Sequence, residues 1–239
     1  MRRRALLALL LLVPAPSIGV VFAMLAPATA GTATGQAIYF ISKAWLLLLP
    51  LVWLLYVERG PLSLSPARRG GFGMGISLGI AISLAIFGAY AMLSHLIDAE
   101  TVRESAERSG IATPARYIGL AIYIFTINAV LEEYVWRWFV FRQCEKLTQP
   151  FGAKGGMIAV FLSALLFTAH HVFALAAQFD ARFTILASLG VFIGGVVWSW
   201  CYLRYRSIWP GYVSHAIVDV AVFAIGWKLI FGQVTILAA

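Results

Sequence analysis

The stretch LEEYVWRWF, residues 131–139, places two carboxylates and a guanidinium inside an apolar segment. Each charge near the centre of a membrane-spanning helix costs roughly 2.5–3.5 kcal/mol, so such residues are expected to have partners or a function. Arg137 follows Glu133 by four residues, the spacing at which a carboxylate and a guanidinium meet along a helix. We therefore expect an ion pair between Glu133 and Arg137, which leaves Glu132 without a charged partner on its own helix.

Glu132 is the candidate for proton transfer. Adjacent helical residues project about 100° apart, so Glu132 and Glu133 cannot share one role. The face of Glu132 carries Asn128 one turn earlier, a potential hydrogen-bond donor, and Trp136 one turn later, an apolar wall. A carboxylate in such surroundings suits a general base or acid near neutral pH.

Two further polar clusters lie in other apolar segments. The sequence FTAHH sets Phe167 and His171 on one helical face, and HAIVD sets His215 and Asp219 on another. Groups of this kind are expensive when they face lipid, so we expect both clusters to turn inward with Glu132 and to share one cavity. A single buried histidine is commonly structural. The coincidence of three clusters on three separate segments favours a function.

Glu132, His171, His215 and Asp219 could activate a water molecule in two ways, without a metal or through a zinc ion. In the metal-free version, Glu132 and His171 take a proton from water, while His215 and Asp219 act beside the carbonyl oxygen. Asp219 must then be protonated or must orient His215, because an ionised carboxylate cannot donate a hydrogen bond. In the zinc version Glu132, His171 and His215 hold the metal, a known type of catalytic zinc set. The sequence lacks HExxH and each ligand comes from a different helix, so we favour the metal-free version and expect no cofactor.

The composition is that of a membrane protein. Of 239 residues 62% are hydrophobic and only 12% are charged, whereas about a quarter are charged in soluble domains. The net charge of +8 comes from short clusters between apolar runs, not from a basic domain, so we expect no nucleic-acid partner. The two cysteines, Cys144 and Cys201, form no CxxC pair and support neither a disulfide framework nor a thiolate site.

Seven apolar runs are long enough to cross a bilayer, which takes about 20 residues. They lie at about 5–27, 37–57, 72–97, 117–141, 156–178, 183–203 and 208–231. This pattern predicts an all-α polytopic membrane protein with about seven transmembrane helices. The last four runs carry all three motifs and form the expected catalytic core.

The chain divides at the mixed-charge segment between the third and fourth runs. Residues 1–116 comprise three spans and an outer amphipathic or loop segment, 117–231 comprise the catalytic core, and 232–239 form a short tail. Gly71, Gly75 and Gly79 have the four-residue spacing of a helix that packs closely on a neighbour.

The basic residues indicate orientation. If the spans alternate, the clusters at the N-terminus and between spans 2 and 3, 4 and 5, and 6 and 7 all fall on one side, which the positive-inside rule assigns to the cytoplasm. We therefore expect a multi-pass protein of a bacterial plasma membrane with a cytoplasmic N-terminus. A cleavable signal peptide ending after Ala30 is the alternative for span 1, but its apolar stretch is long and contains Pro14 and Pro16.

The three motifs together resemble those of the CPBP intramembrane proteases, which include the type II CAAX prenyl endopeptidases. EEYVWR is similar to EExxxR, FTAHH to FxxxH and HAIVD to HxxxN/D, in the family's order, and the resemblance covers roughly residues 118–225. It implies a helical intramembrane endopeptidase of the glutamic type. Asp219 stands where the eukaryotic CAAX enzymes have Asn, so prenylation of the substrate stays open.

The resemblance also implies residue roles. Glu132 and His171 match the pair that activates water, His215 and Asp219 the pair on the oxyanion side, and Glu133 and Arg137 the supporting part of the first motif. The expected partners are the lipid bilayer and a membrane-associated peptide or protein substrate. A proton-coupled transporter and a non-catalytic immunity protein are the alternatives, although no internal repeat of the kind found in transporters is evident.

Overall fold

A computed structural model describes residues 2–232, which are largely helical and contain no β-strand. The N-terminal part consists of α1 (Arg2–Leu12), α2 (Pro14–Val20), η1 (Val21–Leu25), α3 (Ala33–Val52), η2 (Trp53–Glu58), α4 (Phe72–Leu93), η3 (Ser94–Leu96) and α5 (Ala99–Arg108). The remainder consists of α6 (Pro114–Tyr123), η4 (Ile124–Asn128), α7 (Ala129–Glu132), η5 (Glu133–Phe141), α8 (Arg142–Thr148), η6 (Gln149–Lys154), α9 (Gly155–Ala176), α10 (Ala181–Tyr205) and α11 (Trp209–Phe231). Except for Gly232, the tail predicted at 232–239 lies outside the described residues.

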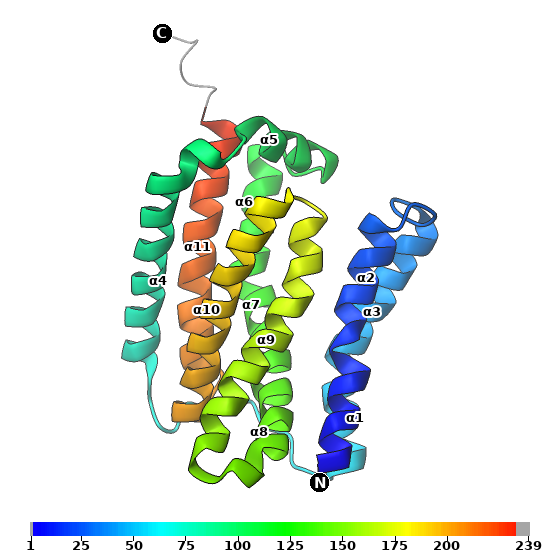
Figure 1. Ribbon diagram of the computed structural model, residues 1–239, viewed down its shortest axis with the longest axis vertical. Helices are drawn as coiled ribbons and strands as arrows, with labels where there is room; N and C mark the ends of the chain where they lie inside the picture. Colours follow the sequence, from blue (N-terminus) through cyan, green and yellow to red (C-terminus); the bar gives the residue numbers. More distant parts are fainter. Residues whose placement is uncertain (1, 233–239) are drawn as a thin grey trace.

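Within residues 2–232, six helical stretches are long and apolar enough to cross a membrane. The fourth, Pro114–Ala176, is 63 residues long and is interrupted at Gly152, whose φ of 57° and ψ of −131° are not helical. Figure 1 shows α6 to α8 running toward the N-terminal end of the molecule and α9 returning beside them. The predicted all-α polytopic fold is confirmed, and the predicted count of seven spans is consistent with this division.

The helices form a main group and a hairpin. In the main group α9 packs on α10, α10 on α11, and α11 on α4 (Figure 1). Helices α1 and α2 pair with α3, and this hairpin contacts the main group through α8, α9 and η5. The three predicted motifs therefore lie on α7 and η5, on α9, and on α11, all in the main group.

Glycines set the distance between α4 and α11. A Cβ at Gly75 would lie 2.3 Å from the carbonyl oxygen of Pro210, and one at Gly79 would lie 2.9 Å from Cβ of Ile217. Both distances are too short for any side chain to fit. The predicted packing role of these two glycines is therefore confirmed. Their absence of side chains lets α4 pack closely on α11, the helix that carries His215.

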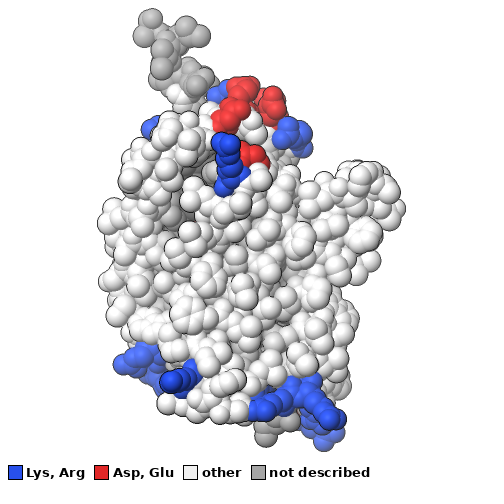
Figure 2. Space-filling model, viewed as in Figure 1, with Lys and Arg blue, Asp and Glu red and all other residues white. Residues whose placement is uncertain are grey.

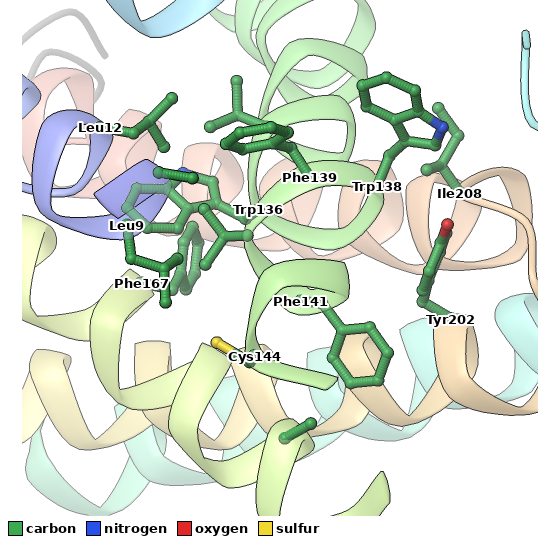
Figure 3. Packing of buried hydrophobic residues seen from close by; sticks show 14 of the residues in the cluster. Leu9, Leu12, Trp136, Trp138, Phe139, Phe141, Cys144, Phe167, Tyr202 and Ile208 are labelled. Atoms are coloured by element: carbon green, nitrogen blue, oxygen red, sulfur yellow. The ribbon is translucent and has the colours of Figure 1, made fainter. Parts of the chain in front are cut away.

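One large apolar cluster holds the hairpin to the main group. It combines Leu9 and Leu12 of α1 with Trp136 and Phe139 of η5 and Phe167 of α9 (Figure 3). Burial of each large side chain stabilises the fold by about 1.5–3 kcal/mol in water, but lipid is itself apolar, so close packing replaces part of that driving force here. Trp136 and Phe167 belong to two of the motifs, so this cluster also fixes the polar groups beside them.

The two ends of the molecule differ in charge. In Figure 2, the end where the N-terminus lies shows only Lys and Arg, whereas the opposite end, over α5, shows Asp and Glu together with Lys and Arg. The helix α5 at this second end is capped at its first turn by Asp98, which accepts from the amide of Glu100 at 3.0 Å. Hydrogen bonds from the Thr101 hydroxyl and the Glu100 amide hold the pKa of Asp98 below its usual value.

Candidate active site

Three helices bring the polar residues together within the main group. Glu132 ends α7 and Glu133 begins the π-helical stretch η5, His171 lies on α9, and His215 and Asp219 lie one turn apart on α11. Wider π-helical turns occur frequently at functional sites. Here the change of helix type falls between the two glutamates.

Glu133 and Arg137 form the centre of a group that we call the closed cluster, with Trp198 and His215. Both Glu133 and Arg137 are 0% exposed, and Oε1 of Glu133 lies 3.4 Å from Nη1 of Arg137. The same Oε1 lies 3.1 Å from Nδ1 of His215. A carboxylate only accepts, so His215 donates through Nδ1 and its Nε2 points away from Glu133.

Aromatic rings enclose the closed cluster. Trp198 stacks on His215 with ring centroids 3.8 Å apart and an angle of 16° between the planes. Its Nε1 donates to the hydroxyl of Ser214 at 3.1 Å. The guanidinium carbon of Arg137 lies 4.4 Å from the centre of the Phe167 ring and 5.1 Å from that of Trp198, which is cation–π geometry. The Glu133 carboxylate and the two aromatic rings therefore lie around the guanidinium of Arg137.

Glu132 and Asp219, which both lie near Nε2 of His215, form a second group, the open cluster. Asn128 donates to Oε1 of Glu132 at 2.8 Å, as its spacing predicts. The side chains of Glu132 and Asp219 remain 20% and 17% exposed. Nε2 of His215 lies 3.8 Å from Oε2 of Glu132 and 3.8 Å from Oδ1 of Asp219. These distances exceed direct hydrogen bonds and are typical of groups that a water or substrate oxygen can bridge.

His171 lies on α9, and its ring contacts that of Phe167 with centroids 4.3 Å apart. Its Nδ1 lies 2.9 Å from the carbonyl oxygen of Phe167, so Nδ1 donates and Nε2 keeps a lone pair. The neighbouring His170 instead stacks on Trp136, with ring centroids 6.3 Å apart.

The comparisons with known proteins address the segment that carries these groups. Residues 114–221 match the family model of the type II CAAX prenyl endopeptidases, Rce1-like. We refer to this matched stretch, which covers less than half of the chain, as the Rce1-like domain. The family supports a CAAX-type intramembrane protease, and the resemblance seen in the three motifs is confirmed. Neither the comparison with curated proteins nor the comparison with solved structures gave a match.

The Rce1-like domain contains every site residue predicted from the sequence. Glu132 Oε2 and Asp219 Oδ1 each lie 3.8 Å from Nε2 of His215, and Glu133 pairs with Arg137 as expected. Asp219 makes no direct hydrogen bond to His215, and its Oδ2 has no partner among the described residues. The contact that orients His215 comes from Glu133.

Sequence reasoning missed two features of the Rce1-like domain. No residue of α10 was singled out, yet Trp198 touches both His215 and Arg137. The contact of Glu133 with His215 joins positions 82 residues apart, which no local spacing reveals.

Among residues 2–232, no group of three or more His, Cys, Asp or Glu side chains has an arrangement that could hold a metal ion.

Proposed function

We propose that this protein is an intramembrane endopeptidase in which Glu132 and His171 activate a water molecule and His215 and Asp219 act beside the carbonyl oxygen of the cleaved bond. The observation that carries the proposal is the pair of 3.8 Å distances from His215 Nε2 to Glu132 and Asp219, next to a partly exposed Glu132. A water or carbonyl oxygen placed there would meet a base on one side and a donor on the other.

The steps follow from the polar atoms. Glu132, assisted by the lone pair of His171 Nε2, accepts a proton from water as the water oxygen attacks the carbonyl carbon. His215 already donates Nδ1–H to Glu133, so it donates to the oxyanion through Nε2 as an imidazolium, whose charge Asp219 balances from 3.8 Å. The proton held by Glu132 then passes to the leaving nitrogen, and the peptide bond breaks.

The substrate is a membrane-associated peptide or protein, because the site lies between membrane-spanning helices. We place the basic end of the molecule, with the N-terminus, in the cytoplasm of a bacterium by the positive-inside rule (Figure 2).

The substitution Glu132→Gln tests the base. It retains the shape of the side chain and removes the proton acceptor, so we expect turnover of membrane peptides in detergent to fall about 10²–10⁴-fold. Thermal unfolding should be unchanged, because Glu132 has no ion-pair partner as close as Arg137 is to Glu133. Glu104→Gln on the exposed α5 is the matched control. Full activity of the Glu132→Gln protein would remove Glu132 from its role.

Metal analysis of the same preparations separates the glutamic route from a zinc route through Glu132, His171 and His215. We expect active wild-type protein to contain less than stoichiometric zinc and to keep its turnover in chelator. Stoichiometric zinc, with activity lost on chelation and restored by the metal, would replace the water-activating role of Glu132 with metal ligation.

A further inference from the structure

A cavity of about 600 Å³, which we call the basic cavity, lies apart from the open cluster. It is lined by residues of η2, the loop 59–71, η5, α8 and the last turn of α10, and these elements meet at the end of the molecule where the N-terminus lies (Figure 1). Small-molecule sites commonly have about 300–1,000 Å³. The lining includes none of the four proposed catalytic residues, so the proposed reaction does not use this space.

The basic cavity has an excess of positive charge. Its charged lining residues are four arginines and one carboxylate, namely Arg68, Arg69, Arg142, Arg206 and Glu58. Arg206 forms two hydrogen bonds with Glu145, at 2.7 and 2.8 Å. Glu58 accepts from Lys146 at 2.5 Å and from Gln143 at 2.8 Å. The other three arginines form no ion pair among residues 2–232, so their guanidinium groups can donate to an anion.

Arg142 is held in the wall of the basic cavity. Its guanidinium carbon lies 5.4 Å from the centre of the Trp138 ring, which is cation–π geometry, and both residues line the cavity. A guanidinium is a planar fork of donors that matches two phosphate oxygens at once. Because the ring already restricts the side chain, binding an anion there costs less conformational entropy than at a free arginine.

The loop 59–71 forms a fixed wall of the basic cavity and carries two of the four arginines. The hydroxyl of Ser207 donates to the carbonyl oxygen of Ser65 at 2.7 Å. The amide of Ile208 donates to the Ser65 hydroxyl at 3.1 Å. These bonds tie the loop to the connection between α10 and α11. The two arginines of the loop therefore stay at the rim of the cavity.

The same loop exposes apolar side chains beside its arginines. Leu62 is 65% exposed and Leu64 is 86% exposed, although they lie only a few residues before Arg68 and Arg69. The carbonyl oxygen of Leu64 accepts from Nε1 of Trp209 at 3.0 Å, so this leucine is held next to the first turn of α11. Apolar and cationic side chains together at the end of membrane-spanning helices match the acyl chains and the headgroup of an anionic lipid. A soluble acidic protein would use only the charge.

We propose that the basic cavity binds the phosphate group of an anionic phospholipid. Arg142 and the two arginines of the loop donate to the phosphate oxygens, and the exposed leucines contact the acyl chains. A zwitterionic headgroup binds less tightly, because its cationic part would lie among the arginines. Inorganic phosphate offers the same anion without acyl chains, and the experiment has a separate arm for it. This proposal goes beyond the endopeptidase function and does not depend on it.

The basic cavity shares two helices with the closed cluster. Trp138 directly follows Arg137 on η5, and Tyr202 lies one turn after Trp198 on α10. A lipid in the cavity would contact η5 and α10 at the same time. Because a ligand that binds only the folded state stabilises it, lipid binding should raise the unfolding temperature.

The test is thermal unfolding of the full-length protein in detergent micelles, titrated with dioctanoyl phosphatidylglycerol. Parallel titrations use dioctanoyl phosphatidylcholine and inorganic phosphate. We expect phosphatidylglycerol to raise the midpoint saturably by about 2–4 °C or more, with an apparent affinity about tenfold above that of phosphatidylcholine. A negligible shift with inorganic phosphate identifies the lipid as the source. An equal shift at equal concentration would retain the phosphate site and overturn the lipid assignment.

Substitutions of the lining arginines should weaken that response. Each basic residue near an anionic lipid surface contributes about fivefold to affinity, so we expect about fivefold weaker binding for Arg142→Gln and a larger loss for Arg68→Gln/Arg69→Gln. Arg142→Lys, which keeps the charge without the fork, should be intermediate. Arg204→Gln is the matched control, because Arg204 lies 5.5 Å from the centre of the Tyr205 ring near the same end of α10 but does not line the cavity. It should bind as the wild type does.

The control also separates a built site from diffuse attraction. If Arg204→Gln weakened binding as much as Arg142→Gln, the lipid would be attracted by the charge of the whole basic end, and the proposal would be overturned. Equal responses to phosphatidylglycerol and phosphatidylcholine would overturn it as well. A soluble Glu-rich peptide that raised the midpoint at lower concentration than phosphatidylglycerol would assign the cavity to a protein partner instead. Each variant is compared with its own lipid-free midpoint, so a change in stability alone does not alter the outcome.

Discussion

Glu132 and Glu133 are adjacent in the chain, but their environments are opposite. Glu133 is fully buried, 3.4 Å from Arg137 and 3.1 Å from His215, within the aromatic walls of the closed cluster. Glu132 is partly exposed, with Asn128 as its hydrogen-bond donor and with His215 3.8 Å away. One carboxylate is thus committed to protein partners, and the other keeps lone pairs for a molecule that enters.

The difference indicates how an apolar chain holds a reactive carboxylate in the membrane. The closed cluster carries its own charge balance, because Arg137 offsets Glu133 and the rings of Phe167 and Trp198 cover the guanidinium. His215 belongs to this cluster through Nδ1 and faces the open cluster through Nε2. The closed cluster can therefore fix the position of His215 while Glu132 remains available for chemistry.

Arg137→Met should have the largest effect on stability of any change in the closed cluster. It leaves the buried Glu133 carboxylate without its counter-charge, and removing one partner of a buried ion pair typically costs about 3–5 kcal/mol. We expect a marked fall in thermal unfolding temperature in detergent, and a partial recovery in the double variant Glu133→Gln/Arg137→Met. Glu132→Gln, in the open cluster, is the control with unchanged stability. Equal destabilisation by Glu132→Gln and Arg137→Met would contradict the conclusion that only the closed cluster stabilises the fold.

Gly211→Ala tests the packing of the closed cluster from α11. A Cβ at this position would lie 2.6 Å from Oε2 of Glu133, a buried oxygen that has no hydrogen-bond partner among residues 2–232. Because the carboxylate is enclosed, we expect overpacking to cost about 1–3 kcal/mol of unfolding free energy and to displace His215, lowering kcat. Gly190→Ala on α10 is the matched control, since no atom lies within 4 Å of its added Cβ. A neutral result at Gly211 would mean that Glu133 can move freely.

Contacts between residues close together in the chain could be predicted from the sequence. The four-residue helical spacing predicted the ion pair of Glu133 with Arg137 and the contact of Asn128 with Glu132. The length of the apolar segments predicted the all-α membrane fold. The cost of polar groups in lipid was sufficient to predict that Glu132, His215 and Asp219 would lie together. Their catalytic roles stay predictions that the Glu132 and metal experiments test.

Contacts between distant helices were beyond such reasoning. Trp198 is one of several tryptophans, and only the packing of α10 on α11 reveals that it stacks on His215. Glu133 and His215 are 82 residues apart in the chain, and only the packed structure brings η5 and α11 into contact there. Both features depend on which helical faces meet, and neither the periodicity nor the spacing along the chain specifies that.

Trp198→Phe should have the smallest effect on stability of these variants, and it tests whether the closed cluster positions His215 for the open cluster. Phenylalanine can still stack on His215 but loses the Nε1 donor to Ser214, so we expect a loss of about 0.5–1.5 kcal/mol in unfolding free energy. Because the ring also limits the tilt of His215, kcat/KM should fall by up to about tenfold, with KM nearly constant if the oxyanion contact is made only in the transition state. Trp200→Phe, on the same helix but outside the stack, controls for the loss of indole area. If the two variants lost activity equally, the position of His215 would not depend on Trp198, and Glu133 alone would connect the closed cluster to the open one.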